Sequence, residues 1–143
     1  MDSSRTPRVL SVLVGDDDSA IRECVVEMLV RQGFDVHTAN TGDAAFRTLL
    51  QCSIDFSILD VEMPGMTGLQ VVEAYVSGPW IVGSAGRSAR RSRREMPTIF
   101  MSGNPAREIR DACETLGSTF LDKPFAVDDM RSAVNRILAA HPF

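Results

Sequence analysis

Long apolar stretches are missing from this chain of 143 residues. Its apolar runs, such as residues 9–14 and 56–59, are too short to cross a bilayer. The opening residues MDSSRTPR lack the apolar core of a secretory signal. A hydrophobic content of 44% is nevertheless enough to fill one core. The sequence therefore predicts one compact domain, residues 1–143, that works in the cytoplasm and has no membrane partner.

Cysteine is scarce as well, with an odd number of residues that lie far apart in apolar surroundings: Cys24, Cys52 and Cys113. This spacing indicates neither a disulfide framework nor a C-x-x-C metal site. All three side chains are expected to be core thiols, because unpaired cysteine behaves as a small apolar residue.

Lysine occurs once, as Lys123, against fourteen arginines, and the net charge of the chain is −4. Residues 79–96 hold five of the arginines and carry +4, so the remainder carries −8. Nucleic acid is an unlikely partner for an acidic domain, because affinity for phosphate backbones comes from clustered Lys and Arg. The arginine segment itself is expected to be a flexible surface insertion. The alternative is a docking element, for which a second copy of the chain is one candidate partner.

Short apolar runs alternate with longer segments of helical period, which predicts β-α-β units and a parallel sheet. Five strands are expected, at residues 9–14, 34–38, 56–59, 98–101 and 119–121. Five helices are expected after them, beginning at Asp18 or Ser19, at Thr41, near Gly68, at Asn104-Pro105 and shortly before Met130. In the second helix the stripe predicted to face inward includes Leu49 and Leu50.

The residues that come directly after these strands are chemically informative. Asp16 and Asp17 follow the first strand, and Asp60 ends the third. Ser102 follows the fourth strand, and Lys123 follows the fifth. Parallel strands bring their carboxyl ends to one edge of the sheet, where such folds bind ligands. Three carboxylates, a hydroxyl and an ammonium are therefore expected to converge.

Carboxylates that lie close together repel, so they stay ionised only with a compensating cation or a shared proton. Mg²⁺ is the expected cofactor, because it takes one or two carboxylates and leaves coordination positions for a phosphate oxygen. One carboxylate can then attack phosphorus, while Lys123 and Ser102 can neutralise and orient the phosphoryl oxygens. Each residue alone could equally be a helix cap or a loop residue, as Asp18 is interpreted to be.

Four motifs appear in a fixed order, VLVGDDDSAI, FSILDVEMPGMTGLQ, IFMSGNP and FLDKPF. Together they resemble the receiver domain of two-component response regulators, of the single-domain, chemotaxis-regulator-like kind. The resemblance extends from Arg8 to about Ala140. It implies a flavodoxin-like, doubly wound parallel sheet of five strands in the order 2-1-3-4-5 with five helices.

The same resemblance assigns roles to the acidic residues and the lysine. It implies that Asp60 accepts the phosphoryl group. Asp17, Asp60 and the backbone carbonyl of Glu62 would ligate Mg²⁺, and Asp16 would act mainly through a metal-bound water. Lys123 would pair with a phosphoryl oxygen or with the Asp60 carboxylate. The protein would thus be a phospho-acceptor signalling domain rather than an enzyme, although it would promote its own phosphorylation and dephosphorylation.

Further implied features concern the switch and the partners. Ser102 would bind the phosphoryl group and shift toward it, and Phe120, the switch aromatic, would turn inward behind it. The Lys123–Pro124 peptide would be cis. The donor would be a histidine kinase or a histidine phosphotransfer protein. A downstream protein target would bind the face formed by the fourth helix, fifth strand and fifth helix.

One departure from the family and two alternative functions stay open. The separation of Asp60 from Ser102 exceeds the family's usual spacing, and the excess lies between Val76 and Met96. It is assigned to the insertion, residues 79–96, at the sheet edge opposite the carboxylates. A Mg²⁺-dependent aspartyl phosphohydrolase would carry a second acid where Glu62 stands, but no cap domain follows. A phosphorylation-independent interaction module would not need the complete set of acids, hydroxyl and lysine.

Overall fold

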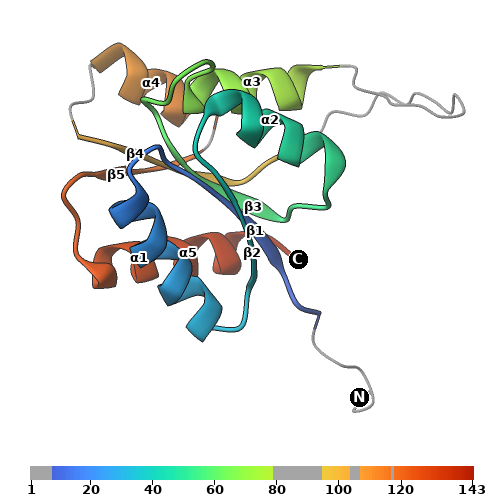
Figure 1. The fold of residues 1–143 in the computed structure, drawn as a ribbon, viewed down its shortest axis with the longest axis vertical. Helices are drawn as coiled ribbons and strands as arrows, with labels where there is room; N and C mark the ends of the chain where they lie inside the picture. The colour runs from blue at the N-terminus through green and yellow to red at the C-terminus, as the bar shows by residue number, and fades with distance from the viewer. Residues whose placement is uncertain (1–7, 79–94, 104–106, 117) are drawn as a thin grey trace, which may run out of the picture.

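A computed structural model of the chain describes residues 8–78, 95–103, 107–116 and 118–143. Within these residues the strands form one parallel sheet in the order β2-β1-β3-β4-β5 (Figure 1). The strands are β1 (Ser11–Gly15), β2 (Asp35–Ala39), β3 (Phe56–Asp60), β4 (Thr98–Ser102) and β5 (Thr119–Asp122). The helices are α1 (Ser19–Arg31), α2 (Gly42–Gln51), α3 (Gly68–Ser77), α4 (Arg107–Thr115) and α5 (Val127–Ala140). This is the flavodoxin-like topology that the sequence predicts.

The sheet lies between two layers of helices, with α1 and α5 on one face and α2, α3 and α4 on the other (Figure 1). Each face has its own core cluster, which contains Ile58 on the α1/α5 side and Leu59 on the other. Consecutive residues of a strand point to opposite faces, so a strand covered on both sides is apolar throughout. This explains why every residue of β3 and β4 is buried.

Side-chain caps fix where three of the helices begin. Asp18 accepts hydrogen bonds from the first turn of α1, as the sequence predicts, and the chain turns after this helix at Gly33, whose φ is +94°. The Thr41 hydroxyl caps α2. Thr67 and Gln70 form a capping box at α3, which sequence reasoning missed.

Three sequence predictions about burial are wrong. Of the three expected core thiols only Cys113 is buried, whereas Cys52 is half-buried and Cys24 is exposed. In α1 the buried stripe consists of Val25, Met28 and Leu29, and the residue just before Val25 points elsewhere. Leu50 is 43% exposed, since Leu49 faces the sheet. Met96, placed in the surface insertion, belongs to the core cluster that leads into β4.

Other predictions fall outside the described residues. They include the Asn104-Pro105 cap and the arginine-rich part of the insertion, residues 79–94. Within the described ranges, none of the helices has the length and apolar character that a bilayer span requires.

Candidate functional site

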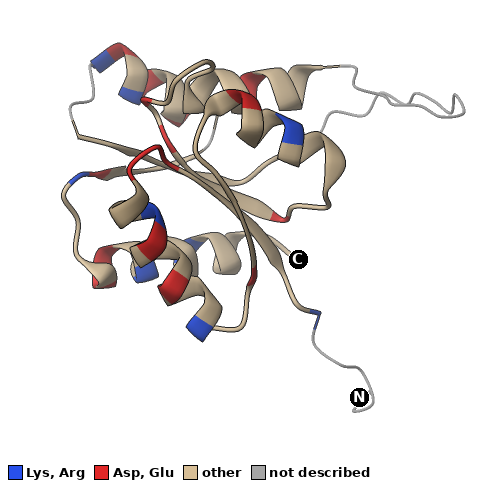
Figure 2. Cartoon of the chain, in the orientation of Figure 1, with Lys and Arg blue, Asp and Glu red and all other residues tan. Residues whose placement is uncertain are grey.

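Three carboxylates meet at the carboxyl-terminal edge of the sheet. Asp16 and Asp17 lie in the loop between β1 and α1, and Asp60 is the last residue of β3. One oxygen from each lies within 4.8 Å of the others. Acidic residues gather at this edge, beside the start of α1 (Figure 2). Asp16 and Asp60 are buried and Asp17 is exposed, so the cluster opens toward solvent on one side only.

Asp16 is held by contacts from four directions. Its backbone N–H donates to the Ala39 carbonyl at 3.1 Å, and its backbone carbonyl accepts from Arg22 Nη1 at 2.7 Å. Its Oδ1 accepts from the Asp18 N–H at 2.9 Å. Its Oδ2 lies 3.0 Å from Lys123 Nζ, yet among the described residues it accepts no well-aligned hydrogen bond. This buried oxygen therefore keeps free capacity for a further positive partner.

Lys123 joins the two buried carboxylates, because its Nζ lies 3.0 Å from Asp16 Oδ2 and 3.2 Å from Asp60 Oδ2. Its backbone N–H donates to the Ser102 carbonyl at 2.8 Å, and the Lys123–Pro124 peptide is cis. Burial lowers the pKa of Lys123, but the close contact with Asp16 and the negative charges of Asp60 and Asp16 outweigh it and raise the pKa overall. The site thus contains a stable ammonium.

Asp60 is only 3% exposed, and its Oδ1 accepts a hydrogen bond from the Glu62 N–H at 3.2 Å. Burial and the charge of Asp16 raise the pKa of Asp60 to about 6, against the opposing pull of Lys123 and the Glu62 N–H. One ammonium therefore does not compensate this set of carboxylates. The raised pKa and the unsatisfied Asp16 oxygen indicate a site that fits an additional hard cation with oxygen ligands, such as Mg²⁺.

Ser102 and Glu62 are linked at the same edge. Ser102 is buried at the end of β4, and its hydroxyl donates to Glu62 Oε2 at 3.0 Å. Sequence reasoning considered the Glu62 side chain only as the second acid of a phosphohydrolase, and it missed this contact with Ser102. Its only sequence signal is that an acid stands two residues after Asp60. The hydroxyl that would bind a phosphoryl oxygen is engaged by a carboxylate in this structure.

Phe120 lies within β5, opposite Phe100 of β4, and is half-buried. The guanidinium carbon of Arg110, in α4, lies 4.7 Å from the centre of its ring. Arg110 also pairs with Asp122 at 2.9 Å. These contacts attach α4 to β5 through two side-chain interactions, and no sequence motif pointed to Arg110.

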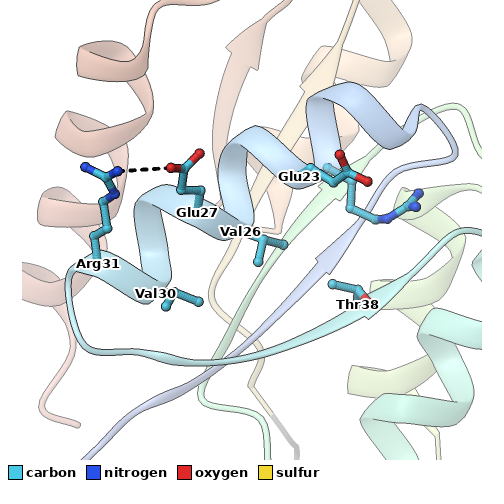
Figure 3. Close-up of a pocket in the computed structure, with 7 residues that line it drawn as sticks. Glu23, Val26, Glu27, Val30, Arg31 and Thr38 are labelled. Carbon is cyan, nitrogen blue, oxygen red and sulfur yellow. Dashed lines mark hydrogen bonds and ion pairs between the residues drawn. The ribbon is translucent and has the colours of Figure 1, made fainter.

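A separate hollow of about 560 Å³ lies between α1 and β2 (Figure 3). Val26, Val30 and Thr38 line it, and the Glu27–Arg31 ion pair, at 3.1 Å, lies along its rim. None of the three clustered carboxylates lines this hollow. Arg22 also lines this hollow, and it is the residue through which the hollow adjoins the acidic loop.

Comparisons with known proteins agree on one family. The family model described as the response regulator receiver domain matches residues 12–79. The sensor protein GacS of Pseudomonas syringae pv. syringae is 31% identical over 133 residues, 92% of this chain. The response regulator MprA of Mycobacterium leprae is 27% identical over 130 residues, 90% of this chain. The crystal structure of the chemotaxis response regulator CheY4 of Vibrio cholerae superposes with a TM-score of 0.71 at 25% identity.

These relatives differ in how much of them the chain matches. The superposition on CheY4 covers 91% of this chain and 99% of that one. The chain spans 51% of the length of MprA and 13% of the length of GacS. The likeness therefore concerns one module, which occurs alone in some proteins and as part of longer chains in others.

Proposed function

Because this chain belongs to the response regulator receiver family, which accepts phosphoryl groups in two-component signalling, we propose that Asp60 is its phospho-acceptor. The observation that carries the proposal is the Lys123 ammonium, which lies 3.0 and 3.2 Å from two buried carboxylates while a third stands beside them. The donor is a histidine kinase or a histidine phosphotransfer protein. We propose that residues 1–143 act as one such domain and that they work in the cytoplasm.

The residues present fit a Mg²⁺ ion. Asp17, Asp60 and the backbone carbonyl of Glu62 would hold it, with Asp16 acting through a water. When bound, the ion supplies positive charge that offsets the charge developing on the transferred phosphoryl group.

The chain's own residues perform the transfer. A carboxylate oxygen of Asp60 forms a bond to phosphorus, while the bond from phosphorus to the donor's histidine nitrogen breaks. Lys123, already placed beside Asp60 Oδ2, neutralises a phosphoryl oxygen. Ser102 leaves Glu62 and donates its hydroxyl to the phosphoryl group, and Phe120 turns inward behind it.

The output follows from this movement. Receiver domains interact with histidine kinases and with downstream effectors. We propose that the switched surface comprises α4, β5 and α5, and that a downstream protein, or a second copy of the chain, binds there. The domain has a signalling role, and promotion of its own phosphorylation and dephosphorylation belongs to this proposal.

A small acyl-phosphate donor tests the assignment, because it needs only Mg²⁺ and a positioned carboxylate. Intact-mass measurement should show one added, base-labile phosphoryl group on the wild type and none on Asp60→Ala. An exposed acid, changed in Asp111→Ala, is the matched control and should leave phosphorylation intact. The same mass gain in Asp60→Ala would refute the acceptor assignment.

The same experiment separates the two alternative functions. No phosphorylation of the wild type at saturating Mg²⁺ and donor would favour a phosphorylation-independent interaction module. Continuous release of inorganic phosphate over many turnovers would favour an aspartyl phosphohydrolase.

A further inference from the structure

Arg22, in the first turn of α1, makes a contact that the proposed chemistry does not use. Its Nη1 donates to the backbone carbonyl of Asp16 at 2.7 Å. Its own backbone N–H donates to the Asp18 carbonyl at 3.0 Å. One residue therefore holds the acidic loop on both sides of Asp17, and this residue is half-buried.

The three carboxylates differ in how their directions are fixed. Asp16 is held by the Asp18 N–H and by Lys123. Asp60 is held by the Glu62 N–H and by Lys123. The Asp17 carboxylate makes no hydrogen bond or ion pair with any described residue. Its direction is consequently set by the backbone that carries it.

The peptide that joins Asp16 to Asp17 is the part of this backbone that Arg22 contacts. A charge-assisted hydrogen bond to its carbonyl is stronger than a neutral one and fixes the plane of the peptide. Together with the φ angle of Asp17, that plane determines where the Cα–Cβ bond of Asp17 points. Groups that hold metal ligands in this indirect way commonly change metal affinity when they are removed.

We propose that Arg22 is a positioning residue for the divalent-cation site, which it serves by orienting Asp17 through the Asp16 carbonyl. The inference rests on the proposed function, since it requires that Asp17 is a Mg²⁺ ligand. According to this inference, the positively charged Arg22 side chain strengthens the binding of Mg²⁺. A positive charge that acted only through its field would do the opposite, because it repels the metal.

Calorimetric titration with Mg²⁺, in the absence of any phosphoryl donor, tests the direction of this effect. We expect Arg22→Met to bind Mg²⁺ about tenfold more weakly than the wild type. Arg22→Lys should recover part of the loss, because an ammonium can still donate to the carbonyl. Arg31→Met is the matched control, since Arg31 lies exposed in the same helix and pairs only with Glu27, and its affinity should equal that of the wild type.

A double variant separates positioning from general destabilisation. Arg22→Met added to Asp17→Asn should weaken Mg²⁺ binding no further than Asp17→Asn alone, because both changes act through the Asp17 carboxylate. An additive loss would show that Arg22 does not act through Asp17. Equal or tighter Mg²⁺ binding in Arg22→Met would also overturn the inference. If Arg22→Met failed to fold, as judged by circular dichroism, the Mg²⁺ affinities of Arg22→Lys and Arg22→Gln would be measured instead. Affinities equal to that of the wild type in both variants would overturn the inference.

The outcome also distinguishes this inference from the proposed function. A wild-type protein that bound no Mg²⁺ would refute both together. A wild-type protein that bound Mg²⁺ with an affinity unchanged in Arg22→Met would refute only the positioning role.

Discussion

The part of the site built on β1, β3 and β4 and the part built on α4 and β5 are constructed differently. On the first side, Asp16 and Asp60 are buried and are held by backbone groups and by Lys123. On the second, no residue of β5 is buried, and Cys113 is the one buried residue of α4 among those described. Groups that must keep a fixed geometry thus stand in the densely packed half. The half proposed to move has little apolar contact to lose.

Two phenylalanines in register sharpen this comparison, because Phe100 of β4 and Phe120 of β5 lie side by side on the same face of the sheet. Phe100 is fully buried, whereas Phe120 is half-buried beside Arg110. We expect Phe100→Ala to lower the free energy of unfolding by about 3–5 kcal/mol. Phe120→Ala should cost about 1–2 kcal/mol, since a half-exposed ring buries less area.

Urea unfolding of both variants measures the difference. The slope of the transition should be the same for the two variants, which would show that only stability has changed. Equal losses would contradict the division of the site into a densely packed half and a weakly packed half.

The second prediction concerns charge in the densely packed half. In the absence of metal, ionised Asp60 destabilises the fold, because burial and the Asp16 carboxylate raise its pKa from 3.8 to about 6. Asp60→Asn should therefore raise the free energy of unfolding by about 2 kcal/mol at pH 7.5. The full gain in the free energy of unfolding would be larger, but the substitution also removes the charge-assisted contact between Asp60 and Lys123.

The dependence on pH gives this prediction its sign. Folded Asp60 binds a proton more tightly than unfolded Asp60, so its unfavourable contribution is complete above about pH 6 and disappears as the pH falls toward 3.8. The advantage of Asp60→Asn should shrink over the same interval, as measured by thermal or urea unfolding. Saturating Mg²⁺ should shrink it as well, because the ion stabilises the wild type. Asp111→Asn, an exposed control, should follow the wild-type profile.

Much of this arrangement was predictable from the sequence, for a physical reason. Continuous apolar runs identify buried parallel strands, and the topology brings their carboxyl ends together. The meeting of Asp16, Asp17, Asp60, Ser102 and Lys123 at one edge follows from that rule alone. The backbone therefore determines which short side chains can meet.

Apart from the pairing of Lys123 with Asp60, contacts made by long side chains were not predictable. Arg22, Glu62 and Arg110 each have several rotatable bonds and more than one polar group within reach, so their choice of partner depends on tertiary packing. Leu50 was misplaced because two adjacent leucines fit the helical stripe almost equally well, and only the position of the sheet shows which one is buried. The sequence pattern thus specifies the site's composition better than the contacts that tune it.

Glu62 provides the third prediction, at the boundary between the two halves. Its carboxylate accepts the Ser102 hydroxyl that is proposed to bind the phosphoryl group. Removing this competitor in Glu62→Ala should release the hydroxyl from this one hydrogen bond and accelerate phosphorylation by a small acyl phosphate roughly fivefold, as expected for one hydrogen bond of about 1 kcal/mol.

Mass-spectrometric time courses at saturating Mg²⁺ measure the rate. Glu108→Ala, which removes an acid from the first turn of α4, is the control and should leave the rate unchanged. A slower reaction in Glu62→Ala would indicate that the carboxylate assists the transfer instead of competing for Ser102.

The smallest change in stability is expected at Arg110, where the two contacts that join α4 to β5 lie near the surface. A cation–π contact and an exposed ion pair together contribute about 1 kcal/mol or less, so Arg110→Met should barely shift the urea midpoint. The orientation of Phe120 should respond more strongly, because the guanidinium holds the ring in its half-buried position. In the unphosphorylated protein, amide exchange in β5 and α4 should therefore increase in Arg110→Met, while exchange in β1 and β3 stays as in the wild type.

Arg131→Met removes a comparable exposed pair, with Asp128 on α5, and should not have this effect. Exchange that increased equally in β1 and β3 would mean that the two halves open together, and the contrast between them would then describe packing density but not motion.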